Sequence, residues 1–238
     1  FLGGDYFKFT TFALSVMAMY EIVRMTFKET NIVVLGLSSL AGALLFLNEE
    51  ITQLQLYGLL FLILVGMLAT VVATGHKIKL VEIGSIIFVT SYIFIGFYCL
   101  FMIRNLSLSH VAYLLLTIWF TDSFAYFGGM KFGKNKLSPK ISPNKSIEGS
   151  VIGSLSSIAI ALLFFYTTNI FSNLLVAIVV TLVVSAVGQF GDLIESAYKR
   201  EYQVKDSSNL LPGHGGIFDR FDSVILSAPC LIILLSLF

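Results

Sequence analysis

Long apolar runs constrain this chain more than any other feature of its sequence. Stretches of about 18 or more apolar residues recur, and each is long enough to cross a hydrocarbon core of about 30 Å. Apolar residues make up 57% of the chain and charged residues 12%, whereas a soluble domain carries about 25% charged residues. The sequence therefore predicts an all-α, polytopic integral membrane protein.

Eight transmembrane helices are expected in this chain. Their predicted ranges are 6–26, 31–47, 54–74, 83–103, 108–127, 149–171, 173–191 and 223–238. Residues 1–4 resemble the tail of an earlier apolar segment, so we expect nine helices in the full-length protein. The two cysteines, Cys99 and Cys230, lie inside apolar runs and indicate neither a disulfide framework nor a zinc site.

The distribution of basic residues predicts the orientation. If the loop 128–148 faces the cytoplasm and the spans alternate, 13 of the 15 Lys and Arg residues lie on the cytoplasmic side. This bias follows the positive-inside rule. A second polar stretch, 192–222, then shares the cytoplasmic face with the loop 128–148. Only the hairpin of the sixth and seventh spans separates them, so the two can meet.

The stretch 192–222 contains the chemistry that phosphoryl transfer needs. Carboxylates bind hard metal ions, and cationic side chains bind phosphate oxygens. The stretch holds six acidic and four basic residues: Asp192, Glu195, Glu201, Asp206, Asp219, Asp222, Lys199, Arg200, Lys205 and Arg220.

Asp192 is the first candidate in this stretch. A carboxylate at membrane depth is costly unless it is paired, solvated or metal-bound. Gly188 and Gly191 beside it allow another backbone to come close. If the helix continues, Glu195 and Lys199 lie on the same face as Asp192. The alternative is an ordinary helix end at the membrane interface.

Asp219 and Asp222 share one face of a predicted helical turn. Acidic residues also favour the positive end of a helix, so simple capping competes with a functional role for Asp222. His214 lies in a glycine-rich run before them, where it could contact substrate or metal-bound water. Such a loop histidine is more often solvated or capping.

Basic residues form the other half of the candidate site. Lys199, Arg200, Lys205 beside Asp206, and Arg220 could contact phosphates and neutralise the charge of a leaving group. The alternative is that they are positive-inside residues at the headgroup surface.

Two further candidates precede the stretch. Lys145 and Ser146 lie at the expected start of the sixth span, where a helix N-terminus favours phosphate; a basic loop with a helix cap is the alternative. Asp122 lies inside the fifth span, where an acid indicates a pathway or a site. A buried hydrogen bond to Ser123 or Tyr126 would also explain it.

These residues resemble the phosphatidate cytidylyltransferase (CDP-diacylglycerol synthase) family. Two blocks, 122–149 and 188–192, are similar to the family, as is Tyr20–Glu21. The most specific part of the resemblance is a run of fixed positions near the C-terminus: Ser196, Lys199, Arg200, Lys205, Asp206, Pro212, His214, Gly215, Gly216, Asp219, Arg220 and Asp222.

The resemblance implies that the phosphate of phosphatidic acid attacks the α-phosphorus of CTP, which gives CDP-diacylglycerol and pyrophosphate. It implies Mg²⁺ held by Asp192 and Asp219, with a second cation left open. The implied catalytic residues are Asp192, Asp219, Asp222, Lys199 and Lys205. The implied substrate-binding residues are Asp122, Lys145, Ser146, Arg200, Asp206, His214 and Arg220.

The expected partners are CTP, phosphatidic acid and the lipid bilayer, with no nucleic acid and with a homodimer left open. We expect an N-terminal transmembrane region, 1–107, and a catalytic transmembrane region, 108–238, in a bacterial inner membrane with a cytoplasmic site. Three alternatives remain: a polyprenol kinase, a CDP-archaeol synthase, and an ion-coupled transporter in which Asp122 and Asp192 bind the ion.

Overall fold

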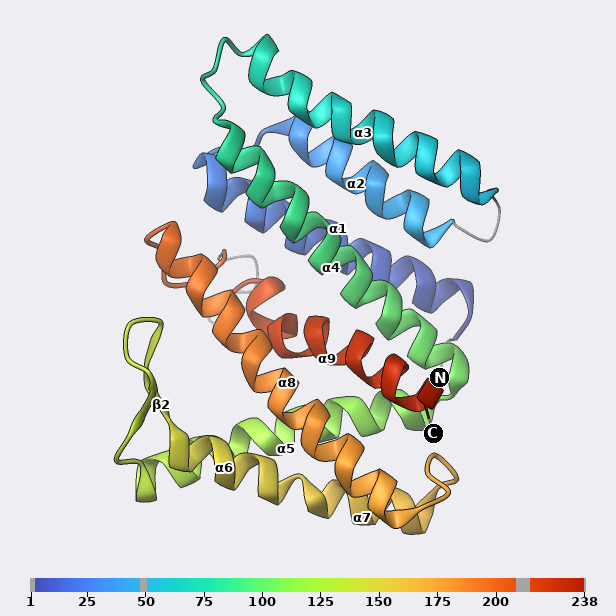
Figure 1. Ribbon diagram of the computed structural model, residues 1–238, viewed down its shortest axis with the longest axis vertical. Helices are drawn as coiled ribbons and strands as arrows, with labels where there is room; N and C mark the ends of the chain where they lie inside the picture. The colour runs from blue at the N-terminus through green and yellow to red at the C-terminus, as the bar shows by residue number, and fades with distance from the viewer. Residues whose placement is uncertain (1–2, 48–50, 209–214, 238) are drawn as a thin grey trace. The chain divides into compact units, whose positions relative to one another are not determined.

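The computed structural model describes residues 3–47, 51–208 and 215–237. These residues form nine α-helices and one two-stranded antiparallel sheet (Figure 1). The helices are α1 (Asp5–Phe27), α2 (Ile32–Phe46), α3 (Gln53–Ala73), α4 (Leu80–Leu106), α5 (Leu108–Phe132), α6 (Ile147–Ser156), α7 (Ile158–Thr167), α8 (Leu174–Glu201) and α9 (Phe218–Leu237); the strands are β1 (Lys136–Ser138) and β2 (Ser142–Ser146).

The chain divides into two compact units. The N-terminal unit comprises Leu2–Phe101 and Asp206–Phe218. The C-terminal unit comprises Met102–Lys205 and Asp219–Phe238, together with residue 1. The described residues of a short segment late in the chain, 206–208 and 215–218, therefore belong with the N-terminal helices, while the residues on both sides of the segment belong to the C-terminal unit.

The expectation of a helical membrane protein is confirmed in its coarse form. Among the described residues, six helices are long and apolar enough to cross a bilayer: α3, α4, α5, α6 with α7, α8 and α9. The other two predicted spans are helical as well. However, α2 has only 15 residues, and α1 is less apolar and carries Asp5, Lys8, Glu21 and Arg24.

In the N-terminal unit, α2 lies between α1 and α3 (Figure 1). Side-chain caps begin two of these helices. Asn31 accepts a hydrogen bond from the Val34 N–H (3.1 Å), and Thr52 forms a capping box with Gln55, so backbone N–H groups that lack helical partners are satisfied. Thr90 donates a buried hydrogen bond to Ser38 (3.2 Å) between α4 and α2.

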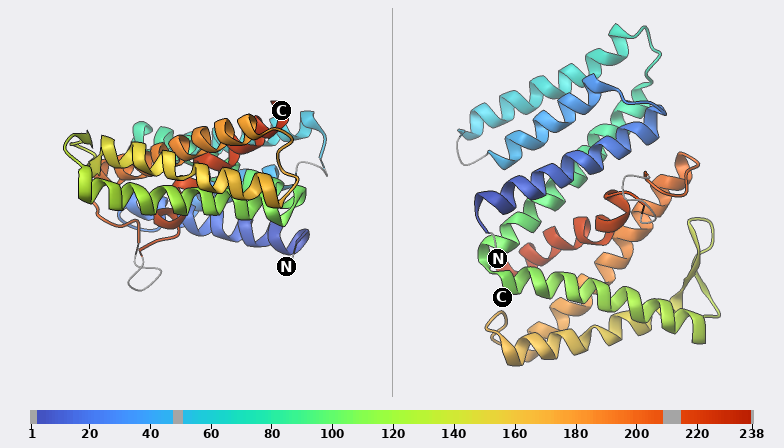
Figure 2. Two further views of the ribbon diagram at one scale, coloured as in Figure 1. Left: turned by 90° about the horizontal axis from the view of Figure 1, so that it is seen from below. Right: turned by 180° about the vertical axis from the view of Figure 1, so that it is seen from behind.

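In the C-terminal unit, α5 runs beside α6 and α7, and α8 packs against all three (Figure 2). Two glycines of α6 allow the close approach of α5. An added Cβ would lie 2.5 Å from the Ala125 carbonyl oxygen at Gly149, and 2.5 Å from the Thr121 carbonyl oxygen at Gly153. Small residues at such crossings are typical of helix packing in membranes.

Buried polar side chains connect the same helices. Thr121 of α5 donates to Ser185 of α8 (2.9 Å), and Ser185 donates to Ser154 of α6 (3.1 Å). The Gln189 amide also donates to Ser154 (2.9 Å). The hydrocarbon core of a bilayer contains no water that could form hydrogen bonds with these groups. Their mutual hydrogen bonds therefore specify how the three helices pack.

The structure differs from the expected elements in two places. The sixth span is not one helix, because α6 ends at Ser156 and α7 begins at Ile158; the Ser157 hydroxyl donates to the Ser154 carbonyl at the break (2.7 Å). The loop 128–148 contains the β1–β2 hairpin, which the all-α prediction missed. Its residues are mostly polar and lack a strand-like alternation of apolar side chains.

The helix crossing at Gly153 gives the first prediction. Gly153→Ala should lower the stability of the purified protein by about 1–3 kcal/mol, because the new methyl group would meet backbone that cannot move aside. Gly36→Ala on α2 is the matched control, since an added Cβ has nothing within 4 Å there. It should be neutral or stabilising by about 0.5–1 kcal/mol. Thermal unfolding in detergent measures both, and equal midpoints would contradict the packing argument.

Candidate active site

Three carboxylates of the C-terminal unit form a compact group. One oxygen from each of Asp192, Glu195 and Asp222 lies within 4.8 Å of the others. Asp192 and Glu195 are one turn apart on α8, and Asp222 lies in the first turns of α9. The helix continues beyond the predicted end of the seventh span at residue 191, because α8 extends to Glu201, so the condition under which Glu195 and Lys199 share a face with Asp192 is met. Oxygen ligands at this spacing suit Mg²⁺.

Glycines allow α8 and α9 to bring these carboxylates together. An added Cβ at Gly191 would lie 2.6 Å from the Asp222 carbonyl oxygen, and one at Gly188 would lie 3.0 Å from the Ser227 hydroxyl. No other residue type fits at Gly191 without moving the backbone that carries Asp222. The close approach of another backbone that the sequence predicted is confirmed at Gly191, whereas Gly188 faces side chains.

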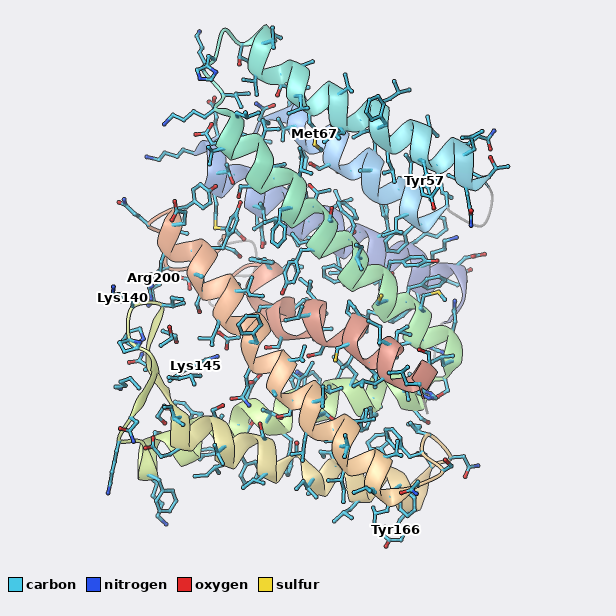
Figure 3. All side chains as sticks on the ribbon, in the orientation of Figure 1. Tyr57, Met67, Lys140, Lys145, Tyr166 and Arg200 are labelled. Carbon is cyan, nitrogen blue, oxygen red and sulfur yellow. The ribbon has the colours of Figure 1, made fainter. Side chains whose placement is uncertain are left out.

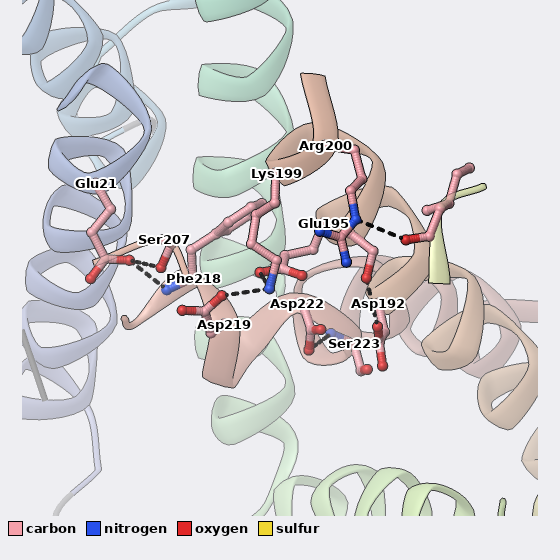
Figure 4. A network of polar contacts seen from close by, with 12 residues as sticks. Glu21, Asp192, Glu195, Lys199, Arg200, Ser207, Phe218, Asp219, Asp222 and Ser223 are labelled. Atoms are coloured by element: carbon pink, nitrogen blue, oxygen red, sulfur yellow. Dashed lines mark hydrogen bonds and ion pairs between the residues drawn. The ribbon is translucent and has the colours of Figure 1, made fainter. Parts of the chain in front are cut away.

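Lys199 compensates part of the negative charge (Figure 4). Its ammonium lies 2.6 Å from Glu195, one turn earlier on α8, and 2.9 Å from Asp219 at the start of α9. The Glu195 side chain is only 2% exposed. Because a buried carboxylate without a partner is costly, the contact with Lys199 offsets part of the cost of burying Glu195.

Lys145 brings the second predicted segment to the same place. Lys145 lies on β2 (Figure 3). Its ammonium is 2.5 Å from an Asp192 carboxylate oxygen. Both side chains are partly exposed, at 29% and 28%. The expectation that the loop 128–148 meets the stretch 192–222 is therefore confirmed for this pair of residues.

The hairpin that carries Lys145 is held at both ends. At its base, Glu148 accepts hydrogen bonds from the Lys134 N–H (3.1 Å) and the Asn135 side-chain amide (2.7 Å). Near its tip, the Arg200 guanidinium donates to the Ile141 carbonyl (3.2 Å). Ser146 begins α6 and accepts from the Gly149 N–H (3.1 Å). Its capping role is thus observed, and its predicted phosphate contact stays a prediction.

A cavity of about 550 Å³ opens beside the Lys145–Asp192 pair. It lies within the C-terminal unit, between α5, α6, α8 and β2. Its walls combine charged, polar and apolar groups: Asp122, Ala125, Tyr126, Gly129, Met130, Leu137, Asn144, Lys145, Ser146, Ser150, Gln189 and Asp192. Asp122 is an exposed side chain in this wall, so the structure places it with Lys145, Ser146 and Asp192.

The other predicted site residues lie elsewhere. Arg200, Lys205 and Arg220 of the C-terminal unit are exposed and do not line the cavity among the described residues. Asp206 is exposed in the N-terminal unit, and His214 falls outside the described residues. Asp219, a predicted metal ligand, pairs with Lys199 and is not one of the three grouped carboxylates.

Two residues of this site, Glu195 and Gln189, are not among the predicted site residues. Glu195 belongs to the carboxylate group, and its spacing of three from Asp192 and four from Lys199 was the available signal. Gln189 lines the cavity, and no motif pointed to it beyond its place in the Gly188–Asp192 block. The roles of the whole set stay predictions.

The central position of Lys199 gives the second prediction. Lys199→Met should cost about 3 kcal/mol of stability, because it leaves buried carboxylates without their cation. Adding Glu195→Gln should restore part of the loss. Lys140→Met, at an exposed hairpin position, is the control and should stay within about 0.5 kcal/mol of the parent. Chemical unfolding of these variants and of Glu195→Gln alone measures the coupling, and additive effects of Lys199→Met and Glu195→Gln would contradict the pairing.

Comparison with known proteins places the chain in a family. The sequence profile described as the Cytidylyltransferase family matches residues 1–238. The phosphatidate cytidylyltransferase of Bacillus subtilis (strain 168) is 38% identical over 247 aligned residues, covering 98% of this chain and 89% of that protein. That of Staphylococcus haemolyticus (strain JCSC1435) is 35% identical, covering 98% and 91%, and that of Staphylococcus aureus (strain COL) is 35% identical, covering 93% and 86%. The chain belongs to the cytidylyltransferase family.

Proposed function

We propose that this protein is a phosphatidate cytidylyltransferase, which converts CTP and phosphatidic acid into CDP-diacylglycerol and pyrophosphate. The names of its relatives support this reaction. One observation carries the link to this site: Lys145 and Asp192, which are 47 positions apart in the sequence, form an ion pair at a cavity beside three grouped carboxylates. The site thus offers cations and carboxylates at one point.

The proposed reaction is an in-line displacement at phosphorus. A phosphate oxygen of phosphatidic acid forms a bond to the α-phosphorus of CTP, and the bond from that phosphorus to the bridging oxygen of the β-phosphate breaks. Pyrophosphate leaves with the electron pair. Because the lipid phosphate is already ionised, the step needs no strong general base. Its main obstacle is the repulsion between two anions, so charge neutralisation and positioning supply the catalysis.

The grouped carboxylates fit a divalent cation. Asp192 and Asp222, with Glu195 beside them, would provide the hard oxygen ligands that Mg²⁺ prefers, and Asp219 lies three residues before Asp222 on α9. When bound, Mg²⁺ would neutralise phosphate charge and orient the reacting groups. Lys199 would neutralise charge from the other side of Glu195. Lys145 and Ser146 would hold a phosphate at the start of α6.

The membrane arrangement is part of the proposal. The bias of basic residues supports eight spans in this chain and a site on the cytoplasmic face. Phosphatidic acid would then reach the cavity sideways from the inner leaflet, with its acyl chains still in the bilayer. Arg200, Lys205 and Arg220 would contact phosphates at the headgroup level, and residues 108–238 would carry the catalytic groups.

Product analysis provides the test of the reaction class. With CTP and Mg²⁺, pyrophosphate should appear only when phosphatidic acid is present, in a 1:1 ratio with CDP-lipid. Asp219→Asn should lower kcat by about 100-fold or more. Removal of one group that stabilises charge in the transition state typically has an effect of this size. Asp5→Asn, an exposed aspartate in the first turn of α1, is the matched control.

Other outcomes would indicate other proteins. Release of CDP with a polyprenol acceptor would identify a kinase, and CDP-lipid formation with an archaeal ether lipid alone would identify a CDP-archaeol synthase. Substrate flux in proteoliposomes without consumption of CTP would favour a transporter. Near-normal turnover by Asp219→Asn would overturn the role given to that residue.

Lys145 gives a separate prediction about the second segment. Lys145→Ala should lower kcat/KM by about 100-fold, because it removes a cation from the cavity and leaves Asp192 without its partner. Lys140→Ala changes a lysine of the same hairpin that is exposed and should leave both constants near those of the parent. Steady-state kinetics with CTP and phosphatidic acid varied in turn measure the effect. Equal kinetics for the two variants would remove Lys145 from the site.

A further inference from the structure

Glu21 of α1 is a fully buried carboxylate with four hydrogen-bond donors around it. One oxygen accepts from the Ser208 hydroxyl (2.7 Å) and the Ile217 N–H (2.8 Å). The other accepts from the Ser207 hydroxyl (2.9 Å) and the Phe218 N–H (2.9 Å; Figure 4). A carboxylate offers about four acceptor positions, so each one is used.

This arrangement suits an ionised carboxylate and no other side chain. Two of its donors are backbone N–H groups at the start of α9, where the partial positive charge of a helix end favours an anion. The ion pairs among the described residues do not include Glu21. Among the described residues, hydroxyl and backbone N–H groups are its partners. A glutamine could not accept all four bonds, because one of its two polar atoms is a donor.

The four donors come from the two ends of one segment. Ser207 and Ser208 lie at the beginning of Asp206–Phe218, and Ile217 and Phe218 lie at its end. Glu21 and its four donors form a clamp on this segment. Gly216 lies against the clamp as well, since an added Cβ there would meet Ser207 and Glu21. Glu21 thus fixes both ends of this segment to α1, about 190 positions earlier in the chain, and all of these contacts lie within the N-terminal unit.

The residues that flank the segment belong to the proposed chemistry. Lys205 directly precedes it, and Asp219 is joined to Phe218 by a peptide bond. A displacement of Phe218 therefore also moves the backbone of Asp219. Such a displacement matters because a misplacement of about 1 Å in a catalytic group can lower the rate strongly. We propose that Glu21 is a positioning residue of the transferase, which fixes the backbone from which Asp219 extends. This inference rests on the proposed function.

The main test is Glu21→Gln, which conserves shape but removes the charge and one acceptor. We expect faster amide hydrogen exchange at Ile217 or Phe218, whichever faces the new NH2 group, because that backbone N–H loses its acceptor. We also expect kcat to fall by about tenfold or more at a temperature where the variant is fully folded, with a smaller change in KM for CTP. Ser207→Ala with Ser208→Ala is the milder variant, and it should give an intermediate loss because both backbone bonds remain.

Two controls separate positioning from a general loss of stability. Ser15→Ala removes a fully buried hydroxyl of the same helix that bonds only to its own α1 backbone. Thr90→Val removes the buried bond to Ser38 in the same unit. Both should keep the parent kcat at temperatures below their unfolding transitions, even where their thermal midpoints fall as far as those of the Glu21 and serine variants.

The outcomes are distinguishable from those of the proposed function. Parent-like kcat in folded Glu21→Gln, or a loss no larger than in Thr90→Val of equal midpoint, would overturn the positioning role while cytidylyl transfer by the parent stands. If Glu21→Gln does not fold, the Ser207→Ala, Ser208→Ala double variant is compared with Thr90→Val in the same way, by its loss in kcat at equal midpoint. Absence of cytidylyl transfer in the parent would overturn both proposals. Unchanged exchange at Ile217 and Phe218 would overturn the clamp itself.

Discussion

Compensation of buried negative charge is the constraint on which the rest of the C-terminal unit depends. Asp192, Glu195 and Asp222 lie close enough to share one ion, and carboxylates this close repel one another unless cations neutralise them. Lys145 pairs with Asp192, and Lys199 pairs with Glu195 and Asp219. Each lysine comes from a different element, so charge pairing also fixes β2 and the start of α9 against α8.

Close helix packing is the second requirement, and it depends on glycine. Gly191 allows the backbone of α9 to reach α8 at Asp222, while Gly149 and Gly153 allow α6 to reach α5. The same contacts bring Ser146 and Lys145, which precede α6, to the mouth of the cavity. Packing and chemistry are therefore specified by the same short blocks of sequence, which is why the blocks could be recognised before any fold was known.

The sequence predicted which polar residues lie together better than it predicted their individual contacts. Charges in an apolar chain are informative because each one needs a physical reason, so Asp122, Lys145 and Asp192 could be singled out as candidates, and the structure brings all three to one cavity. The partner of Asp219 was not predictable, since the pairing with Lys199 depends on the crossing of α8 and α9. The four hydrogen bonds of Glu21 were not predictable either. Their donors lie about 190 positions away in the sequence, and two of them are backbone N–H groups, which nearly every residue type has.

The charge balance of the site indicates how the proposed substrates must arrive. Asp122, Asp192, Glu195, Asp219 and Asp222 supply five carboxyl groups, and Lys145 and Lys199 supply two ammonium groups that pair with Asp192, Glu195 and Asp219. When the carboxyl groups are ionised they outnumber the ammonium groups, and they would then repel a bare nucleotide triphosphate and a bare lipid phosphate. Under the proposed function, CTP therefore has to bind together with a divalent cation, and the exposed arginines and lysines at the headgroup level attract the lipid anion before it reaches the carboxylates. Under the same proposal, the carboxylates would ensure that the substrates bind productively only together with the metal ion that the transfer uses.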